Sequence, residues 1–361
     1  MSLDELFERP QYSLEQSCKE RLLVTELRRL TEHHRRGCAA YARILATLPP
    51  TGGEGLAGVP YLPVSLFKSH RLVSIPDAEV FKVMTSSGTT GQAVSSVVVD
   101  RATAERQSRA LTTIMATVLG PRRLPMIIID APNVVRDRRR FNARAAGVLG
   151  MASLGRRHFY ALDDDMQLDR DGLRDFLRRH DGEPLLIFGF TYMVWRYLLQ
   201  RLDVGEADLS GATLIHSGGW KALQDQAVDN GTFKRVLGEV TGLRRVHNFY
   251  GMVEQVGSVF LEGPDGFLHP PNFADVIIRD PATWQEAPDG TVGVIEVLSA
   301  LPLSYPGHAL LTEDLGVVHG VGDPAQGWGG RRLEVVGRVP RAELRGCSDV
   351  HARVAEAVPA A

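Results

Sequence analysis

Cysteine is scarce in this sequence of 361 residues, which holds only Cys18, Cys38 and Cys347. An odd number of cysteines without Cys-x-x-Cys spacing argues against a disulfide framework and a structural zinc site. No run of about 18 apolar residues occurs, so no membrane span is predicted. Residues 1–20 are charged and contain no apolar stretch ahead of a cleavage site. We therefore expect a cytoplasmic protein in a reducing compartment.

An excess of charge of one sign is also absent. The 41 lysines and arginines face 43 aspartates and glutamates, which gives a formal net charge of −2. Such a balance offers no general attraction to phosphate polymers or anionic lipid, so neither nucleic acid nor a membrane surface is an expected partner. With 44% apolar and 7% aromatic residues, the composition is typical of a globular protein.

Between residues 94 and 262, short apolar runs alternate with helical patterns. The candidate strands are 124–129, 185–188, 213–216 and 246–250. This alternation predicts an α/β fold with a mainly parallel sheet flanked by helices, in which ligands bind beyond the carboxyl ends of the strands. Candidate strands continue after residue 265, at 276–278, 292–298, 316–318 and 332–336.

Ahead of this region, residues 13–48 show the apolar spacing of amphipathic helices. We therefore expect three parts: an N-terminal helical cap (1–80), an α/β domain (81–338) and a short C-terminal tail (339–361). In the cap, Cys18 and Cys38 are interpreted as structural. The pair His33-His34 is interpreted as a solvated helix face, because adjacent helical positions point in different directions and make a poor metal site.

The strongest functional signal is a hydroxyl-rich segment that follows an extended run. It reads Thr85-Ser86-Ser87-Gly88-Thr89-Thr90-Gly91-Gln92. Its two glycines permit a tight path that exposes backbone N–H groups, and its five hydroxyls add donors, so it can wrap a phosphate chain. It is not a Walker A loop, because no Gly-Lys-Ser/Thr follows at the required spacing. An ordinary polar turn is the alternative for this stretch taken alone.

Three further motifs follow in order. They are Asn248-Phe249-Tyr250-Gly251-Met252-Val253-Glu254, Leu311-Thr312-Glu313-Asp314-Leu315-Gly316 and Val336-Gly337-Arg338. Together with the hydroxyl-rich segment, they resemble the adenylate-forming superfamily of acyl-CoA synthetases and related ligases. Two more stretches, Leu62–Lys68 and Arg345-Gly346-Cys347-Ser348, narrow the resemblance to the acyl-protein synthetase family. This is the fatty-acid-activating component of bacterial luminescence and its relatives.

The resemblance implies a fold and a set of residue roles. The fold is the large α/β domain of adenylate-forming enzymes with the C-terminal small domain absent or truncated, since 23 residues follow Arg338. The residues implied to bind ATP are Ser86, Ser87, Gly88, Thr89, Thr90 and Gly91 at the phosphates, Gly218 and Gly219 between acyl group and adenine, Tyr250 on adenine and Asp314 on the ribose hydroxyls. Glu254 would position Mg²⁺, and Arg338 would lie near the nucleotide or pyrophosphate.

Two catalytic candidates are less direct. Lysine is rare, with five against 36 arginines, and Lys82 and Lys221 lie next to the predicted nucleotide segments. Either can supply a cation to phosphate or carboxylate, with Lys221 preferred and an exposed structural lysine as the alternative. Cys347 lies in a polar, glycine-containing stretch near cations that stabilise a thiolate. The resemblance implies that it accepts the acyl group as a thioester; a buried small hydrophobe is the alternative.

The predicted function is ATP-dependent activation of a carboxylic acid, fatty acyl by resemblance, to acyl-AMP. The acyl group then passes to Cys347 and on to a reductase or carrier protein. Two alternatives stay open: a phenylacetate-CoA-ligase-like enzyme with CoA or an amine as acceptor, and a non-catalytic adenylate-binding subunit. His216 and His247 end predicted strands and are candidates for nucleotide or substrate contacts. Residues 188–195 are interpreted as core helix or one wall of an acyl pocket.

Overall fold

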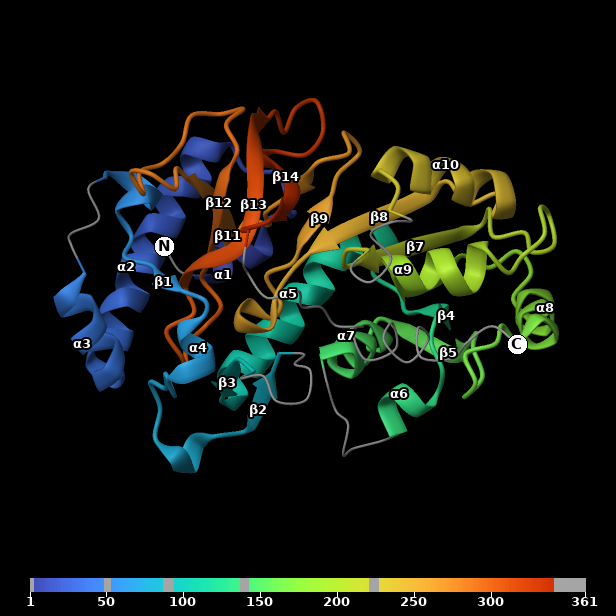
Figure 1. Ribbon diagram of the computed structural model, residues 1–361, viewed down its shortest axis with the longest axis horizontal. Coiled ribbons are helices and arrows are strands. Elements are labelled where there is room, and N and C mark those ends of the chain that lie inside the picture. Colours follow the sequence, from blue (N-terminus) through green and yellow to red (C-terminus); the bar gives the residue numbers. More distant parts are fainter. Residues whose placement is uncertain (1–2, 49–52, 87–93, 137–142, 221–226, 341–361) are drawn as a thin grey trace. The chain divides into compact units, whose positions relative to one another are not determined.

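The computed structural model describes residues 3–48, 53–86, 94–136, 143–220 and 227–340, which fold into two compact units (Figure 1). Of the described residues, 3–48, 53–86, 94–117 and 250–340 belong to unit 1, and 118–136, 143–220 and 227–249 belong to unit 2. The expected division into cap, α/β domain and tail stays a prediction. No helix in the described ranges is long and apolar enough to cross a membrane.

Unit 2 is built on parallel strands. In spatial order they are β8 (Arg245–Tyr250), β7 (Ala212–Ser217), β6 (Leu185–Phe190), β4 (Leu124–Ile128) and β5 (Gly155–Tyr160). Each recorded pairing among them is parallel, and β6 is buried along its whole length. Continuous apolar strands of this kind are typical of parallel sheets covered on both faces. The predicted alternation of strands and helices is therefore confirmed here.

Helices connect these strands. They are α6 (Asn133–Arg136), α7 (Ala143–Ala152), α8 (Arg170–Arg179), α9 (Thr191–Met193) with the π-helical turn Val194–Leu199, and α10 (Asn230–Thr241). The sequence fixes their ends: the Asp169 carboxylate accepts the Gly172 N–H at 2.9 Å at the start of α8. Gly242, with φ of 74°, ends α10 in the left-handed conformation that glycine adopts without strain.

Unit 1 is dominated by antiparallel strands. In spatial order they are β11 (Ala274–Arg279), β12 (Gly293–Ser299), β13 (Ala309–Gly322), β14 (Gly330–Arg338), β10 (Leu268–His269) and β9 (Phe260–Glu262). The short β1 (Leu62–Pro63) pairs in parallel with β13, and β2 (Lys82–Thr85) forms a separate hairpin with β3 (Ser96–Val99). The strands predicted after residue 265 overlap β11 to β14, although β13 is much longer than the predicted 316–318.

Helices of unit 1 include both long amphipathic segments of the N-terminal region. They are α1 (Leu3–Glu8), α2 (Gln16–Gly37), α3 (Ala39–Thr47), α4 (Leu66–Ser69) and α5 (Arg101–Leu119), with 3₁₀ turns at Gly55–Gly58, Asp77–Glu79 and Val253–Gln255. On α2, Leu23, Leu27 and Leu30 are fully buried at helical spacing, which confirms the predicted amphipathic pattern. The buried Lys19 ammonium lies 3.5 Å from Asp275 of β11 and ties the helix to the sheet.

The interpretation of His33-His34 as a solvated face is wrong for His34. Its ring is fully buried, its Nδ1 lies 2.8 Å from the Ser74 hydroxyl, and it stacks on His308 with ring centroids 5.1 Å apart. His34 follows Leu30 by four residues and so continues the apolar face of α2. Only His33, whose Nε2 lies 2.9 Å from the Leu303 carbonyl, keeps partial exposure.

Candidate functional site

The hydroxyl-rich segment connects the two strands of the β2–β3 hairpin. Thr85 pairs with Ser96 at its base. The Ser86 N–H donates to the Ser95 carbonyl at 3.0 Å, and the Ser95 N–H donates to the Ser86 hydroxyl at 2.9 Å. The two ends of the segment are therefore clamped together. Ser87, Gly88, Thr89, Thr90 and Gly91 lie outside the described residues, so their predicted phosphate contacts stay predictions.

Tyr250 and Asp314 are brought together by the fold of unit 1. The Tyr250 hydroxyl, at the end of β8, donates to the Asp314 carboxylate of β13 over 2.7 Å, although 64 positions separate the two residues in sequence. Desolvation and the Asp314 charge raise the pKa of Tyr250 well above its usual value, so the phenol stays protonated as the donor. Two of the predicted nucleotide-binding side chains are therefore in direct contact.

Arg338 joins this pair from the neighbouring strand. Asp314 and Arg338 face each other in the β13–β14 register, and the guanidinium Nε lies 3.2 Å from the second Asp314 oxygen. Its NH2 group lies 3.3 Å from Glu313, whose other oxygen accepts from the Lys68 ammonium at 2.8 Å. An unbroken chain of polar contacts thus runs from Tyr250 to Lys68.

Glu254 lies close to the base of the hairpin. Its side chain is 6% exposed on a 3₁₀ turn, and burial raises the pKa of its carboxyl group. A hydrogen bond from Ser95 and the positive charge of Lys68 act in the opposite direction. Glu254 is therefore coupled both to the clamp beneath the hydroxyl-rich segment and to the polar chain that ends at Lys68.

This environment is compatible with the predicted magnesium role of Glu254. Mg²⁺ in nucleotide sites is held by one or two carboxylates together with phosphate oxygens and water. Among residues 3–340 as far as they are described, no group of three histidine, cysteine or acidic side chains forms a metal site. A magnesium ion at Glu254 would take its other ligands from phosphate oxygens and water, as in other nucleotide sites.

In unit 2, the double glycine follows β7 as predicted. Gly218 has φ of +86°, where a side chain would be strained, and a Cβ at Gly219 would meet no atom within 4 Å. The preceding His216 is buried, with Nδ1 2.9 Å from the Thr191 hydroxyl and its ring 4.8 Å from that of Phe233. Burial lowers the pKa of His216 to about 3, so the ring is neutral. Lys221 lies outside the described residues.

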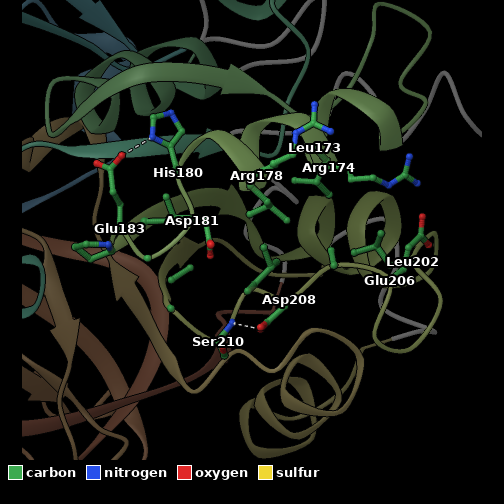
Figure 2. A pocket seen from close by; sticks show the side chains of 18 of the residues that line it. Leu173, Arg174, Arg178, His180, Asp181, Glu183, Leu202, Glu206, Asp208 and Ser210 are labelled. Carbon is green, nitrogen blue, oxygen red and sulfur yellow. Dashed lines mark hydrogen bonds and ion pairs between the residues drawn. The ribbon is translucent and has the colours of Figure 1, made fainter.

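A pocket of about 690 Å³ lies at the amino ends of β6 and β7 (Figure 2). It is lined by the first residues of β6 and β7 and by α8, whose Arg170, Arg174 and Arg178 face acidic neighbours. Arg170 pairs with Glu206, and the other two pair within α8. The pocket is thus charged, and its arginines are already paired with acidic side chains of the protein. It lies at the amino ends of the strands, opposite the edge where α/β folds bind ligands.

Comparison of the sequence with known protein families identifies the family of this chain. The family model described as "Acyl-protein synthetase, LuxE" matches residues 4–355. The chain belongs to this family. Two similar proteins are both named long-chain-fatty-acid–luciferin-component ligase. The one from Vibrio harveyi is 27% identical over 306 residues, which covers 82% of this chain and 78% of the relative. The one from Aliivibrio fischeri is 24% identical over 299 residues, covering 80% and 77%.

Solved structures agree on the fold. An open conformation of 2-hydroxyisobutyryl-CoA ligase superposes with a TM-score of 0.66 at 17% identity, covering 94% of this synthetase and 80% of that chain. The same ligase in its postadenylation state gives 0.66 at 16% identity, with 99% and 76% covered. The predicted family, the enzyme class of an AMP-forming acyl-protein synthetase and the α/β fold of adenylate-forming enzymes are therefore confirmed.

Sequence reasoning missed two residues that the synthetase places in this polar chain. Lys68 was part of a segment that carried the family resemblance, yet no role followed from it. The sequence motif indicates a role for Asp314 and none for its neighbour Glu313. Adjacent residues of a strand point to opposite faces, so the two carboxylates of β13 can reach different partners: Glu313 contacts Lys68 and Asp314 contacts Tyr250, while Arg338 contacts both. That adjacency was the available signal for a second function.

The arrangement in unit 1 is suited to holding a nucleotide. A carboxylate has two oxygens that can each accept a hydrogen bond from a hydroxyl group, and Asp314 is already oriented from both sides by Tyr250 and Arg338. Arg338 and Lys68 supply positive charge within one cluster of contacts, and Glu254 supplies a hard oxygen ligand nearby. These groups match the ribose, the phosphates and the magnesium ion of ATP.

Proposed function

We propose that this synthetase uses ATP and Mg²⁺ to convert a long-chain fatty acid to its acyl-AMP. The acyl group then passes to Cys347, and from there to a partner protein such as a reductase or an acyl carrier. The observation that carries the proposal is the contact between Tyr250 and Asp314, which unites two separate motifs at one place. The names of the Vibrio harveyi and Aliivibrio fischeri relatives support the fatty-acid class of substrate.

In this proposal each residue of the cluster contacts one part of the nucleotide. Asp314 accepts the ribose hydroxyls, Tyr250 packs on adenine, and Gly218 and Gly219 leave room where side chains would obstruct. Ser86 closes the base of a loop whose hydroxyls and N–H groups, from Ser87 to Gly91, donate to the phosphates. Glu254 holds the magnesium ion, which neutralises phosphate charge when bound.

The first half-reaction is a displacement at phosphorus. A carboxylate oxygen of the fatty acid attacks the α-phosphorus of ATP, an O–P bond forms, and the bond to the β-phosphate oxygen breaks to release pyrophosphate. No proton is transferred. Positive groups that are fixed before the reaction stabilise the charge that develops on the phosphate oxygens, and positioning of the two reactants lowers the barrier further.

The second half-reaction is transfer to sulfur. The Cys347 thiolate attacks the acyl carbonyl of the mixed anhydride, and AMP leaves as the thioester forms. Cys347 lies outside the described residues, so the support for this step comes from the sequence motif and from the family. Lys221 stays a proposed cation for the acyl or phosphate groups on the same grounds.

Radiolabelled tetradecanoic acid tests both steps. With ATP and Mg²⁺, the wild-type synthetase should show carboxylate-dependent ATP–pyrophosphate exchange and form acyl-protein that hydroxylamine releases. Cys347→Ser should keep the exchange and lose the hydroxylamine-sensitive label, whereas Cys18→Ser, a half-exposed thiol on α2, should keep both. Exchange without acyl-protein, with thioester or amide formed on added CoA or an amine, would instead identify a ligase for free acceptors. No exchange with any carboxylic acid would identify a non-catalytic subunit.

A further inference from the structure

The segment that ends in Lys68 is held rigidly on the sheet of unit 1. Leu62 and Pro63 pair in parallel with Leu310 and Leu311 of β13, and the Val64 N–H donates to the Leu311 carbonyl at 2.8 Å. One helical turn, α4, follows directly. This added strand brings Lys68 to Glu313, which lies two residues beyond the paired stretch of β13.

The side chain next to Lys68 anchors the turn. Phe67 is 1% exposed and meets the buried Tyr305 ring edge-on, with centroids 6.0 Å apart. Because Phe67 is buried against Tyr305, α4 has little freedom to rotate, and the Lys68 side chain leaves the turn in a different direction, toward Glu313. There the Lys68 and Glu313 side chains are 16% and 23% exposed, which shields the pair yet leaves it within reach of a ligand.

The ammonium of Lys68 interacts with carboxylates of two motifs, 311–316 and 248–254. It donates to Glu313 at 2.8 Å, its charge acts on Glu254, and Glu313 directly precedes Asp314. Asp314 is the proposed ribose ligand and Glu254 the proposed magnesium ligand. In ATP the α-phosphate connects the ribose to the phosphates that bind the metal, so a nucleotide that contacts both carboxylates passes its α-phosphate beside Lys68.

From this placement we infer that Lys68 is a catalytic cation of the adenylation step and that Glu313 is the positioning residue that aims it. The inference rests on the proposed function. An ammonium has three N–H donors, so Lys68 can keep the bond to Glu313 while it donates to a non-bridging oxygen of the α-phosphate. Glu313 uses its other oxygen to hold Arg338, so one carboxylate sets the positions of two cations.

The role of Lys68 is electrostatic. As the fatty-acid oxygen bonds to the α-phosphorus and the bond to pyrophosphate breaks, negative charge on the equatorial oxygens increases, and a fixed ammonium stabilises that state more than the ground state. Transfer of the acyl group to a thiol has its reacting centre at the carbonyl carbon instead. Lys68 therefore acts mainly on the first half-reaction, and this separates it from a purely structural tether between α4 and β13.

The test compares the two half-reactions in the same variants of the full chain. Lys68→Met should lower the turnover number of tetradecanoate-dependent ATP–pyrophosphate exchange about 100-fold, with the KM for ATP changed less than about threefold. Acyl-protein formation from synthetic tetradecanoyl-AMP should fall less than about tenfold. Lys68→Arg keeps the charge and should recover most of the exchange. Lys234→Met, a lysine on α10, is the matched control and should exchange at the wild-type rate.

Glu313→Gln tests the positioning role. It should lower exchange about tenfold with little change in the KM for ATP, because the amide holds Lys68 and Arg338 less firmly. Lys68→Met exchanging at the wild-type rate would overturn the inference, and so would equal losses in both half-reactions with no recovery in Lys68→Arg. An inactive wild-type protein would instead overturn the proposed function. Binding of tetradecanoyl-AMP by Lys68→Met, measured by calorimetry, shows that the variant is folded.

Discussion

Acidification should destabilise unit 1 through the buried histidines His34 and His308. Both rings are at most 1% exposed and stack on each other, and burial lowers the pKa of His34 to about 2 and that of His308 to about 3. An unfolded histidine has a pKa of about 6.5. Because the folded values are lower, the unfolded chain binds more protons below pH 6.5. The contribution of the two neutral histidines to the free energy of unfolding is therefore fully present above pH 6.5. It is lost as the pH falls toward the pKa values of the folded protein.

The size of the effect follows from proton linkage. On unfolding, each of the two histidines takes up almost no proton at pH 7.5 and about one at pH 5.5. Integrated over this range, the uptake lowers the free energy of unfolding by about 1.4 kcal/mol for each histidine. The pair therefore accounts for about 2.7 kcal/mol, a large share of the roughly 5–15 kcal/mol that stabilises a typical domain. Most carboxylates titrate below this range. Burial raises the pKa of Glu296 to about 7, and its protonation in the folded protein acts in the opposite direction, so the histidine contribution is measured as a difference between variants.

Urea unfolding monitored by tryptophan fluorescence at the two pH values measures this loss. His34→Gln and His308→Gln should each reduce the pH-dependent loss by about 1.4 kcal/mol, whatever their effect on stability at pH 7.5. His158→Gln, in which an exposed ring is replaced, should leave the loss unchanged. Equal losses in wild type and in both buried-site variants would refute the reasoning, because they would show that the rings are protonated in the folded protein.

Three further predictions concern the site and its framework. Asp314→Asn should raise the KM for ATP about 10- to 100-fold in pyrophosphate exchange, since a charged hydrogen-bond acceptor is lost; an unchanged KM would remove Asp314 from the ribose site. Glu254→Gln should raise the Mg²⁺ concentration for half-maximal exchange about tenfold, and no shift in that titration would contradict its role as metal ligand. Arg144→Met leaves Asp130 buried without its ion-pair partner and should cost about 3–5 kcal/mol in urea unfolding, most of which Asp130→Asn in the same chain should restore.

The hydroxyl-rich segment illustrates what a sequence reveals about such a site. Glycines and hydroxyls between two extended runs predict a phosphate-binding connection, because their conformational freedom and donors are local properties. The structure adds that Ser86 and Ser95 clamp its two ends. That detail depends on the pairing of β2 with β3, and no local pattern specifies the partner of a strand.

His34 shows the opposite case. Its neighbours in the sequence are charged, and the residue looked exposed by composition. Its burial depends on the face of α2 on which it lies and on its packing against His308, which is 274 positions away in the sequence. The same holds for Glu313 and Lys68, which are separated by 245 positions in the sequence. They meet because the short strand β1, which precedes Lys68, pairs with β13.

The sequence alone thus determined the composition of the elements, the order of the predicted nucleotide-binding motifs and the family, because periodicity and short motifs are carried by neighbouring residues. Only the tertiary structure decided which motifs meet and in what electrostatic setting. Tyr250 reaches Asp314, and Lys68 reaches Glu313, through strand pairing across long stretches of chain. The free energy of such contacts comes from burial and charge in the folded molecule, and a linear pattern does not record it.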